Sequence, residues 1–346
     1  MNETEIKINK VNNYLNDVIT CNKIPGAVIC IGRGQEEVFF KEYGYRQVYP
    51  ERELMHKDTL FDIASLSKVV STWPGIMHLI DEGKIALNQR ITDFLGDDIN
   101  EKLKDVTIKN LLTHTSGLSE RTYLKQFGNN KDDIIRGLLN DKLQDDVNSK
   151  VAYSNRGFII LGIIVEQVSG MALDEYAKKN IWQPMGMYNT TYNPQQDDNI
   201  AATEYIAEKN IVKKGIVHDE NAEVLGGVAG HAGVFSTASD LAKFCRNILN
   251  KSGSGLIIRA LIEESFKNQT EGMNESRGLG WQIINDDEIN VSLVGHLGFT
   301  GTSIWIEPQS GTYVVLLTNR VHPSRDNTNI QEIRKTVRRI VFRNNR

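Results

Sequence analysis

FDIASLSKVVSTW, residues 61–73, places Ser65 three positions before Lys68 and follows the lysine with a run of valines. In a helix, residues three positions apart lie on one face, so the two side chains can touch. A serine hydroxyl is a poor nucleophile until a base takes its proton, and an uncharged lysine is such a base. Apolar neighbours such as Val69 favour the uncharged amine. The stretch therefore predicts an activated serine, and the helix start would aim backbone N–H groups at a developing oxyanion.

This spacing does not decide the matter alone, because S-x-x-K arises by chance and also fits a capping serine beside a surface lysine. Two later stretches add to it: residues 153–155 are Tyr-Ser-Asn, and residues 295–301 are Gly-His-Leu-Gly-Phe-Thr-Gly at the start of an expected strand. Pro74 falls inside the helix that Ser65 should begin, and we expect it to kink that helix or to end it early. Three distant stretches thus have to meet in one fold.

The composition is that of an ordinary globular protein. The chain has 346 residues, 40% of them hydrophobic and 24% charged, which suffices for a sizeable core and a second lobe. The formal net charge of −4 and the pI near 6.0 provide no basic face for nucleic acid. The densest basic run, Arg334, Lys335, Arg338 and Arg339, is expected to decorate one solvated helix. Nucleic acid is therefore not an expected partner.

The N-terminus and the cysteines bear on the compartment. Residues 1–15 are polar where a secretory signal needs about 7–15 apolar residues, and no stretch approaches the ~20 apolar residues of a membrane span. Taking this N-terminus as native, we expect a cytoplasmic protein without membrane insertion. Cys21, Cys30 and Cys245 form no C-x-x-C pair, and any disulfide leaves one of them unpaired. We interpret all three as reduced structural thiols.

Strand-like sequence occurs at both ends of the chain. Five stretches rich in β-branched and aromatic residues are expected to be strands: 27–33, 36–45, 292–298, 301–308 and 312–319. Amphipathic helices are expected from Ile8 to Val18 and from Ile330 to Val341. One sheet assembled from distant segments, with a helical lobe inserted into it, accounts for this order. Residues 1–69 and 223–346 would form the sheet domain, residues 70–222 the mainly helical lobe, and the active site would lie between them.

Taken in this order, the three motifs resemble the serine β-lactamase and penicillin-binding-protein superfamily. The resemblance is to its class C-like branch, whose motifs are S-x-x-K, Tyr-x-Asn and His-x-Gly, and residues 107–118 and 153–170 also look like family segments. It implies an α/β (α+β) fold of the β-lactamase type, an antiparallel sheet flanked by helices and built from both chain ends with an inserted helical lobe. The matching residues are Ser65, Lys68, Tyr153, Asn155, His296 and Gly298.

The resemblance also implies a role for each residue. Ser65 would be the acylated nucleophile, and Lys68 would accept or relay its proton. Tyr153 would serve in proton transfer to the leaving group and in deacylation, while Asn155 would hold the substrate amide and the lysine. The backbone N–H groups of Ser65 and Phe299 would form the oxyanion hole.

His296 departs from the commoner Lys-Thr-Gly pattern of the superfamily. An imidazole is only partly charged at neutral pH, so it is a weaker anchor for the carboxylate of a β-lactam or of a C-terminal D-Ala. This argues against efficient β-lactam turnover. Neither a class A S-D-N motif nor a counterpart of that class's deacylating glutamate is evident.

Residues 218–242 are dense in small residues and contain two of the seven histidines. The sequences HDENA at 218–222 and GHAG at 230–233 resemble a subgroup of cytoplasmic cell-wall recycling amidases, which remove stem peptides from N-acetylmuramic acid. His231 is a candidate for substrate contact, and packing beneath the glycine-rich loop is its alternative. A metal site of His218, Asp219 and His231 is a weaker alternative, because the chain lacks tetrahedral zinc spacing and the serine mechanism needs no metal or cofactor.

Arginines in residues 318–327 are the remaining binding candidates. This segment corresponds to a rim that contacts substrate carboxylates in class C-like relatives, so Arg320 or Arg325 could bind a carboxylate in bidentate fashion. The alternative is a solvated turn before the last helix. His114, in Thr-His-Thr-Ser-Gly, is interpreted as a structural residue that ties a loop to the helical lobe.

These observations favour a cytoplasmic serine hydrolase that works through an acyl-enzyme on an amide or ester, most plausibly a muropeptide amide in peptidoglycan recycling. One alternative is an esterase, a weak β-lactamase or a D,D-peptidase-like enzyme of the same branch. A second is a non-catalytic penicillin-binding sensor, which would not need the full set of motif residues. A small molecule (muropeptide, ester or β-lactam) is the expected partner, no cofactor or metal is expected, and the oligomeric state stays open.

Overall fold

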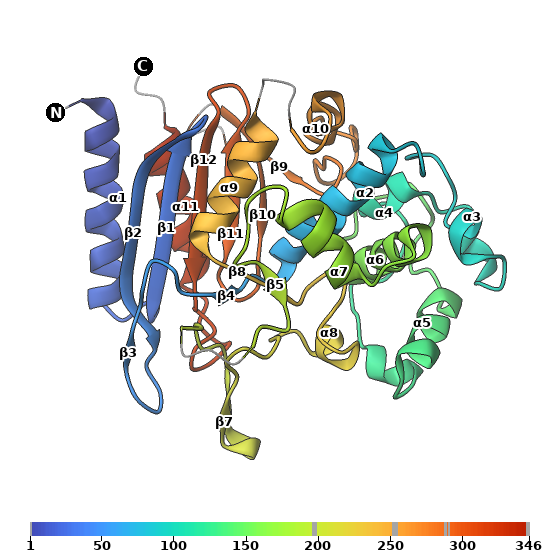
Figure 1. Cartoon of the computed structure of the whole chain (residues 1–346), viewed down its shortest axis with the longest axis horizontal. Helices are drawn as coiled ribbons and strands as arrows, with labels where there is room; N and C mark the ends of the chain where they lie inside the picture. The colour runs from blue at the N-terminus through green and yellow to red at the C-terminus, as the bar shows by residue number, and fades with distance from the viewer. Residues whose placement is uncertain (1, 196–198, 251–254, 287–288, 290, 344–346) are drawn as a thin grey trace.

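The computed structural model describes residues 2–195, 199–250, 255–286, 289 and 291–343. Its centre is an antiparallel sheet of seven strands in the order β3-β2-β1-β12-β11-β10-β9, so the first and last strands of the chain lie side by side (Figure 1). The predicted sheet built from both chain ends is confirmed. The strands are β1 (Gly26–Arg33), β2 (Glu36–Gln47), β3 (Glu53–Leu54), β9 (Gln282–Asp286), β10 (Val291–Leu297), β11 (Ser303–Glu307) and β12 (Thr312–Thr318).

The central strands are apolar on both faces because both faces are covered. Along β1, Val28 and Cys30 point into one core, whereas Ile29 and Ile31 point into the other, as the two-residue period of a strand requires. Cys30 lies opposite Val315 of β12 in the antiparallel ladder. Two separate cores therefore sandwich the sheet.

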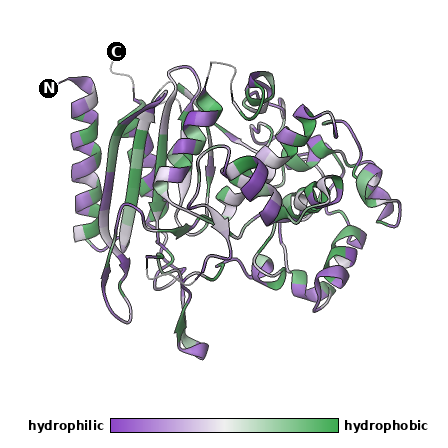
Figure 2. Ribbon diagram, viewed as in Figure 1, coloured by the Kyte–Doolittle hydropathy of each residue, from purple (hydrophilic) through white to green (hydrophobic). Residues whose placement is uncertain are grey.

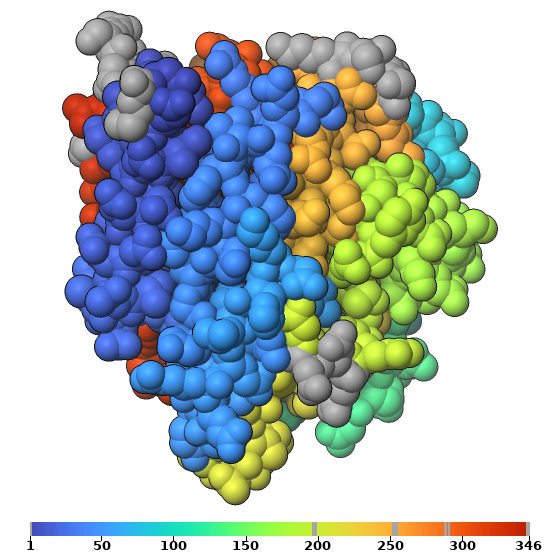
Figure 3. All heavy atoms as spheres, turned by 60° about the vertical axis from the view of Figure 1, so that its left-hand side comes forward, coloured from blue at the N-terminus to red at the C-terminus, as the bar shows by residue number. Residues whose placement is uncertain are grey.

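Helices from the two chain ends cover the outer face of the sheet. α1 (Glu3–Thr20) begins with a capping box, buries Val11, Leu15 and Val18, and packs beside α11 (Ile330–Phe342). Hydrophilic and hydrophobic residues alternate along α1 in Figure 2, and Figure 3 shows α1 forming one side of the molecule next to β2 and β3. The predicted terminal helices are both present.

The other face carries α9 (Ala238–Leu249), which packs on β1 and β12, and beyond it the helical lobe (Figure 1). A second, three-stranded sheet of β4 (Phe61–Asp62), β8 (Val234–Ser236) and β5 (Thr191–Tyr192) joins segments that are distant in sequence. The predicted division at residues 69/70 and 222/223 stays a prediction. The remaining elements are α2 (Trp73–Asp81), α3 (Thr92–Leu95), α4 (Ile108–Leu112), α5 (Lys131–Asn140), α6 (Asn155–Ser169), α7 (Leu173–Ala177), α8 (Glu220–Val224), α10 (Arg259–Ser265), β6 (Tyr205–Ile206) and β7 (Ile211–Val212).

The prediction that the basic run on α11 decorates a solvated helix is wrong in part. Arg334 on α11 is buried rather than solvated, because its guanidinium donates hydrogen bonds to the carbonyl oxygens of Gly298 and Thr302 beneath the sheet. Arg338 forms an ion pair with Asp286 at the end of β9. Arg334 and Arg338 therefore tie α11 to the sheet, whereas Lys335 is exposed as predicted.

Within the described ranges, no single helix is long and apolar enough to cross a membrane. The one combination with that length and composition is a bent pair, Asn155–Ser169 followed by Leu173–Trp182 at 77°.

Candidate active site

Ser65 lies in a single 3₁₀ turn, η1 (Ala64–Leu66), directly after β4. The preceding Ala64 has a φ of +47°, a left-handed conformation that costs an L-residue about 1–2 kcal/mol. The carboxylate of Asp62 holds this turn: its Oδ1 accepts the N–H of Ala64 at 2.8 Å, and its Oδ2 accepts the N–H of His218 at 2.7 Å. Burial raises the pKa of Asp62 to about 6, although both backbone N–H groups favour the charged form.

The helix after this turn differs from the prediction. A π-helical turn, η2 (Lys68–Thr72), precedes α2, and Pro74 sits in the first turn of α2, where a proline is tolerated because its missing N–H has no required partner. The helix then continues to Asp81. Pro74 therefore does not end the helix, and the irregular turn lies before it.

Lys68 is the point at which the distant motifs converge. Its side chain is completely buried, and its Nζ donates hydrogen bonds to Asn155 Oδ1 at 2.8 Å and to the carbonyl oxygen of His231 at 3.1 Å. The same Nζ lies 5.0 Å from the centre of the Tyr153 ring and 5.7 Å from that of Phe158. The S-x-x-K and Tyr-x-Asn motifs therefore share one site.

Lys68 Nζ donates to two oxygens, those of the Asn155 side chain and of the His231 backbone. An ammonium has three N–H bonds, and an uncharged amine has two N–H bonds and a lone pair. In either form, one position on Nζ lies outside these two contacts.

Tyr153 lies in the loop that leads into α6, and aromatic and charged side chains hold its ring. The imidazole of His114 is 4.6 Å from it, centre to centre, and the guanidinium carbon of Arg277 is 5.5 Å from its centre. His114 Nδ1 accepts the backbone N–H of Ser154 at 3.1 Å, and burial holds the pKa of this histidine well below its usual range. The geometry matches the predicted structural role of His114, which fixes the loop that carries Tyr153.

The end of β10 is bound to the nucleophile turn. Thr302 Oγ1 donates to the carbonyl oxygen of Ile63 at 2.9 Å, and Thr300 Oγ1 donates to that of Asp62 at 2.7 Å. A Cβ atom at Gly298 would lie 2.5 Å from the Ile63 carbonyl oxygen, so only glycine permits this approach. Gly298 thus brings the backbone of the following Phe299 beside the turn of Ser65, as the expected oxyanion hole requires.

His296 is neutral rather than partly charged. Burial, together with the charges of Lys68 and Arg277, holds its pKa well below the usual range. Its Nδ1 lies 3.1 Å from the carbonyl oxygen of Leu297, which only a protonated nitrogen can donate to, so Nε2 is an acceptor. Nε2 is buried and has no hydrogen-bond partner among the described residues.

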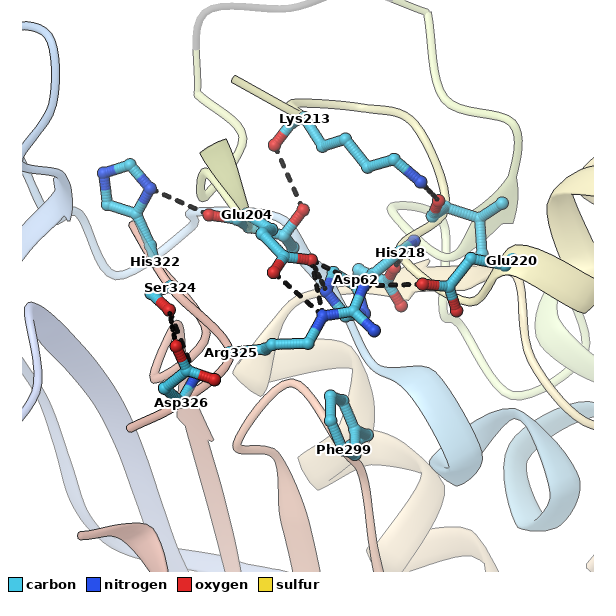
Figure 4. Close-up of polar contacts among 12 residues, drawn as sticks. Asp62, Glu204, Lys213, His218, Glu220, Phe299, His322, Ser324, Arg325 and Asp326 are labelled. Atoms are coloured by element: carbon cyan, nitrogen blue, oxygen red, sulfur yellow. Dashed lines mark hydrogen bonds and ion pairs between the residues drawn. The ribbon is translucent and has the colours of Figure 1, made fainter. Parts of the chain in front are cut away.

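Phe299 lies between two polar side chains at the mouth of the site. Its ring is half exposed, stacks on His218 at 5.6 Å between centres, and lies 4.5 Å from the guanidinium carbon of Arg320. Behind it, Arg325 donates to Glu204 and to Glu220, and His218 Nε2 lies 3.1 Å from Glu204 (Figure 4).

Most N–H groups of Arg320 and Arg325, the two predicted carboxylate-binding arginines, are already used within the protein. Arg320 Nε donates to the carbonyl oxygen of Phe299, and its Nη1 to that of Arg325, both at 2.8 Å. Arg320 lines the site but is largely engaged by the backbone. Arg325 is engaged by Glu204 and Glu220, and these bonds tie down a rim segment whose residues Pro323, Ser324 and Asp326 are exposed.

His231 does not reach the open site with its side chain. Its exposed fraction is 0%, and Nε2 lies 2.9 Å from Asp219 Oδ1. Burial alone would raise the pKa of Asp219, but the charge and hydrogen bond of His231 hold it below its usual range. The predicted direct substrate contact of His231 is thus replaced by a contact through its carbonyl oxygen to Lys68. His218 contacts a different carboxylate, Glu204.

A cavity of about 400 Å³ opens beside Ser65. Two of its arginines, Arg277 and Arg334, were not expected at the site. Arg277 stands before β9 in the sequence Ser-Arg-Gly-Leu-Gly, which does not indicate a binding residue. Arg334 was expected on a solvated helix face. The lining residues are Ser65, Tyr153, Arg277, Gln282, His296, Leu297, Gly298, Phe299, Arg320, Ile330, Gln331 and Arg334.

Two curated proteins are similar to this chain over most of its length. The N-acetylmuramyl-L-alanine amidase of Bacillus subtilis (strain 168) is 29% identical over 91% of this chain and 81% of its own length. A putative D-alanyl-D-alanine carboxypeptidase of Escherichia coli (strain K12) is 28% identical over 91% of this chain and 83% of its own length.

Solved structures share the fold. The octameric penicillin-binding protein homologue from Pyrococcus abyssi superposes with a TM-score of 0.77 at 23% identity, covering 95% of this chain and 77% of that one. A class C β-lactamase from Rhodobacter sphaeroides gives a TM-score of 0.75 at 18% identity, covering 95% and 99%. The family model described as Beta-lactamase matches residues 12–338. The chain therefore belongs to the Beta-lactamase family and is a serine hydrolase of the β-lactamase and penicillin-binding-protein superfamily.

Proposed function

We propose that this protein hydrolyses the amide bond between N-acetylmuramic acid and L-alanine in cell-wall fragments, through an acyl-enzyme on Ser65. The observation that carries the proposal is the buried Lys68, whose Nζ donates to Asn155 and to the carbonyl oxygen of His231, with the Tyr153 ring 5.0 Å away. These contacts support Lys68 as the proton acceptor, Tyr153 as the proton carrier and Asn155 as the amide-binding side chain, and Tyr153 lines the same cavity as Ser65.

In the acylation step, Ser65 Oγ attacks the carbonyl carbon while its proton passes to Lys68 Nζ. The oxyanion is stabilised by the backbone N–H groups of Ser65 and Phe299. Tyr153 carries a proton to the leaving nitrogen, the C–N bond breaks, and the acyl group remains on Ser65.

In the deacylation step, a water molecule attacks the acyl carbon and gives its proton to the Tyr153 and Lys68 pair. The bond to Ser65 breaks, and the serine oxygen regains a proton from the same pair. The acid product leaves, and the site returns to its starting state.

The choice of amide rests on two supports. The segments at 218–222 and 230–233 resemble those of the recycling amidases, and the Bacillus subtilis relative bears the name N-acetylmuramyl-L-alanine amidase. Asp219, which is partly exposed, pairs with the buried His231, and the carbonyl oxygen of His231 accepts a hydrogen bond from Lys68. We place the reaction in the cytoplasm, in the recycling of cell-wall fragments; recovery of the native protein in a membrane or secreted fraction would contradict this location.

The deciding experiment incubates the purified protein with N-acetylmuramyl-L-alanyl-D-glutamate and follows free N-acetylmuramic acid by mass spectrometry. We expect release by the native protein and none by Ser65→Ala, with an unchanged thermal unfolding midpoint. Ser149→Ala, at an exposed position, is the matched control and should retain activity. Full activity of Ser65→Ala would sink the mechanism.

An esterase or weak β-lactamase is the second candidate, because a neutral ester needs no cation at the position of His296 and a β-lactam would be bound there only weakly. Without a lysine at this position, the site has no cation there for a β-lactam carboxylate. Hydrolysis of p-nitrophenyl acetate and nitrocefin without cleavage of N-acetylmuramyl-L-alanine would support this candidate. A penicilloyl adduct on Ser65 that never turns over would instead indicate a sensor.

A further inference from the structure

His218 is a buried histidine whose imidazole has no part in the proposed reaction. It is 3% exposed, and its ring lies against that of Phe299 at the mouth of the site. Its backbone N–H is bound by Asp62, which also holds the turn of Ser65. A single residue therefore contacts both segments whose backbone N–H groups would form the oxyanion hole.

The backbone of His218 is tied to the turn of the nucleophile. Asp62 Oδ2 accepts the N–H of His218 at 2.7 Å, and Asp62 Oδ1 accepts that of Ala64, the residue before Ser65, at 2.8 Å. The Asp62 side chain is buried, so this carboxylate serves the two backbone groups rather than bulk water. Because one carboxylate joins the two segments, the N–H of Ser65 keeps a defined place relative to His218.

The ring of His218 supports the other donor, at Phe299. The two ring centres are 5.6 Å apart and the planes are 22° from parallel, inside the ~4.5–7 Å range of aromatic pairs. Arg320 holds the same residue, with its guanidinium carbon 4.5 Å from the ring centre and its Nε 2.8 Å from the Phe299 carbonyl oxygen. In the part of the chain that the structure describes, the backbone N–H of Phe299 donates to no other residue, so it is available to a substrate oxygen.

Glu204 and Arg325 hold the imidazole in this orientation (Figure 4). Burial and the charge of Arg325 lower the pKa of His218, so the ring is neutral at neutral pH. Its Nε2 lies 3.1 Å from Glu204 Oε2, and a carboxylate only accepts, so Nε2 carries the proton. Arg325 Nε donates to both oxygens of Glu204 at 2.8 Å. Moving the ring away from Phe299 would break its hydrogen bond to a carboxylate that Arg325 keeps in place.

We propose that His218 is a positioning residue that holds the two oxyanion-hole donors, the N–H groups of Ser65 and Phe299, at their working separation. Donors stabilise an oxyanion best at about 2.7–3.1 Å from its oxygen, so a small shift of Phe299 weakens the transition state more than the bound substrate. The proposal rests on the proposed function for the acyl-enzyme on Ser65, but not for the muramyl substrate.

The test compares two esters that differ in one atom, 4-nitrophenyl acetate and its thiono analogue, in which sulfur replaces the carbonyl oxygen. Sulfur is a poor hydrogen-bond acceptor, so an intact oxyanion hole favours the oxygen ester beyond the ratio of the two rates with hydroxide. In His218→Ala we expect kcat/KM for the oxygen ester to fall about 10-fold, less than the ~10²–10³ for loss of a whole donor, with little change for the thiono ester. The oxygen-to-sulfur ratio is independent of how much of each preparation is folded.

His218→Phe separates the stacking from the chemistry of the imidazole. A phenyl ring keeps the contact with Phe299 and loses that with Glu204, whose two oxygens stay bound by Arg325. This variant should keep most of the native ratio, whereas a proton-carrying histidine could not be replaced in this way. His56→Ala, at an exposed histidine, is the matched control and should keep the native ratio. An unchanged ratio in His218→Ala, or a ratio in His218→Phe as low as in His218→Ala, would overturn the proposal.

Binding of phenylboronic acid gives the same comparison without turnover. Its boron adds the oxygen of Ser65, and an oxygen of the resulting tetrahedral adduct occupies the place of the oxyanion. Calorimetric titration should show a Kd about 10-fold higher in His218→Ala, as for the ester, and near the native value in His218→Phe and His56→Ala. Equal affinity of His218→Ala and the native protein would contradict the positioning role.

Failure of the positioning role and failure of the amidase proposal give different results. A native protein that cleaves N-acetylmuramyl-L-alanine, with an oxygen-to-sulfur ratio that His218→Ala leaves unchanged, refutes the positioning role alone. A ratio that falls in His218→Ala and is kept in His218→Phe, without cleavage of the muramyl amide, supports the positioning role and refutes the proposed substrate.

Discussion

At the scale of single residues, Tyr153 is the side chain whose chemistry depends most on its phenolic oxygen. Tyr153→Phe keeps the ring between His114 and Arg277 and removes only the hydroxyl. We expect kcat to fall by ~10²–10⁴, as for other general acid–base groups, with little change in the unfolding midpoint. Steady-state kinetics with Tyr188→Phe as control, at a 75% exposed site, measures this. Activity within twofold of the native value would remove Tyr153 from the mechanism.

Asp62 gives the second prediction at this scale. Because burial raises its pKa to about 6, its carboxylate takes up a proton as the pH falls below that value. A protonated carboxyl can no longer accept both the Ala64 and His218 N–H groups, so the turn that carries Ser65 should loosen. We expect kcat/KM to decrease below about pH 6.

The variant Asp62→Asn tests this assignment, because an amide mimics the protonated acid at every pH. Its activity should be low, and its kcat/KM should not decrease further below about pH 6. Asp58→Asn, at an exposed position, should retain both the native activity and the decrease in kcat/KM. If Asp62→Asn still showed that decrease, the decrease would belong to another group. The other charged groups that act on Asp62 are Asp219 and Lys213.

At the scale of elements, the junction between β10 and the nucleophile turn depends on one glycine. In Gly298→Ala the new Cβ would lie 2.5 Å from the Ile63 carbonyl oxygen and 2.1 Å from Thr302 Oγ1. We expect the end of β10 to move and activity to be lost, with a stability cost of about 1–3 kcal/mol from overpacking. Gly75→Ala in α2 is the control, since the nearest atom is 3.5 Å away and alanine favours a helix. A fully active Gly298→Ala would show that β10 tolerates the shift.

The strands and the helix after Ser65 show which elements the sequence could predict and which it could not. The β-branched and apolar runs along 27–33 and 312–319 identify strands, because a strand covered on both faces is a continuous hydrophobic stretch. β9, with its half-buried Gln-Ile-Ile-Asn-Asp sequence, lacks a strong β-branched run and was not expected. The helix after Ser65 was misread at Pro74, because a π-helical turn has no recognisable residue pattern.

At the scale of the whole molecule, the sequence predicts the site residues that stand in short motifs. It does not predict the residues that only the packing of distant elements brings to the site. Ser65, Lys68, Tyr153 and Asn155 stand in short motifs, and the structure brings them together. Arg334 reaches the cavity only because α11 packs beneath β10 and β11, a long-range consequence that no local pattern in its helix encodes.

The whole molecule should lose stability in mild acid, because it buries neutral histidines. Burial lowers the pKa of His114 and His296 far below 6.5, and those of His218 and His322 to a lesser degree. Below pH 6.5 the unfolded chain takes up protons that the folded chain does not, so the free energy of unfolding falls by up to about 1.4 kcal/mol per histidine per pH unit.

Asp62 acts in the opposite direction, because its raised pKa lets the folded state take up a proton first, between about pH 6 and 4. Four histidines outweigh this one carboxyl, so urea unfolding should show lower stability at pH 5.5 than at pH 7.5. Removing the opposing group in Asp62→Asn should steepen the decline. Equal stability at both pH values would mean that the buried histidines take up protons in the folded protein, and the neutral state assigned to His296 would have to be abandoned.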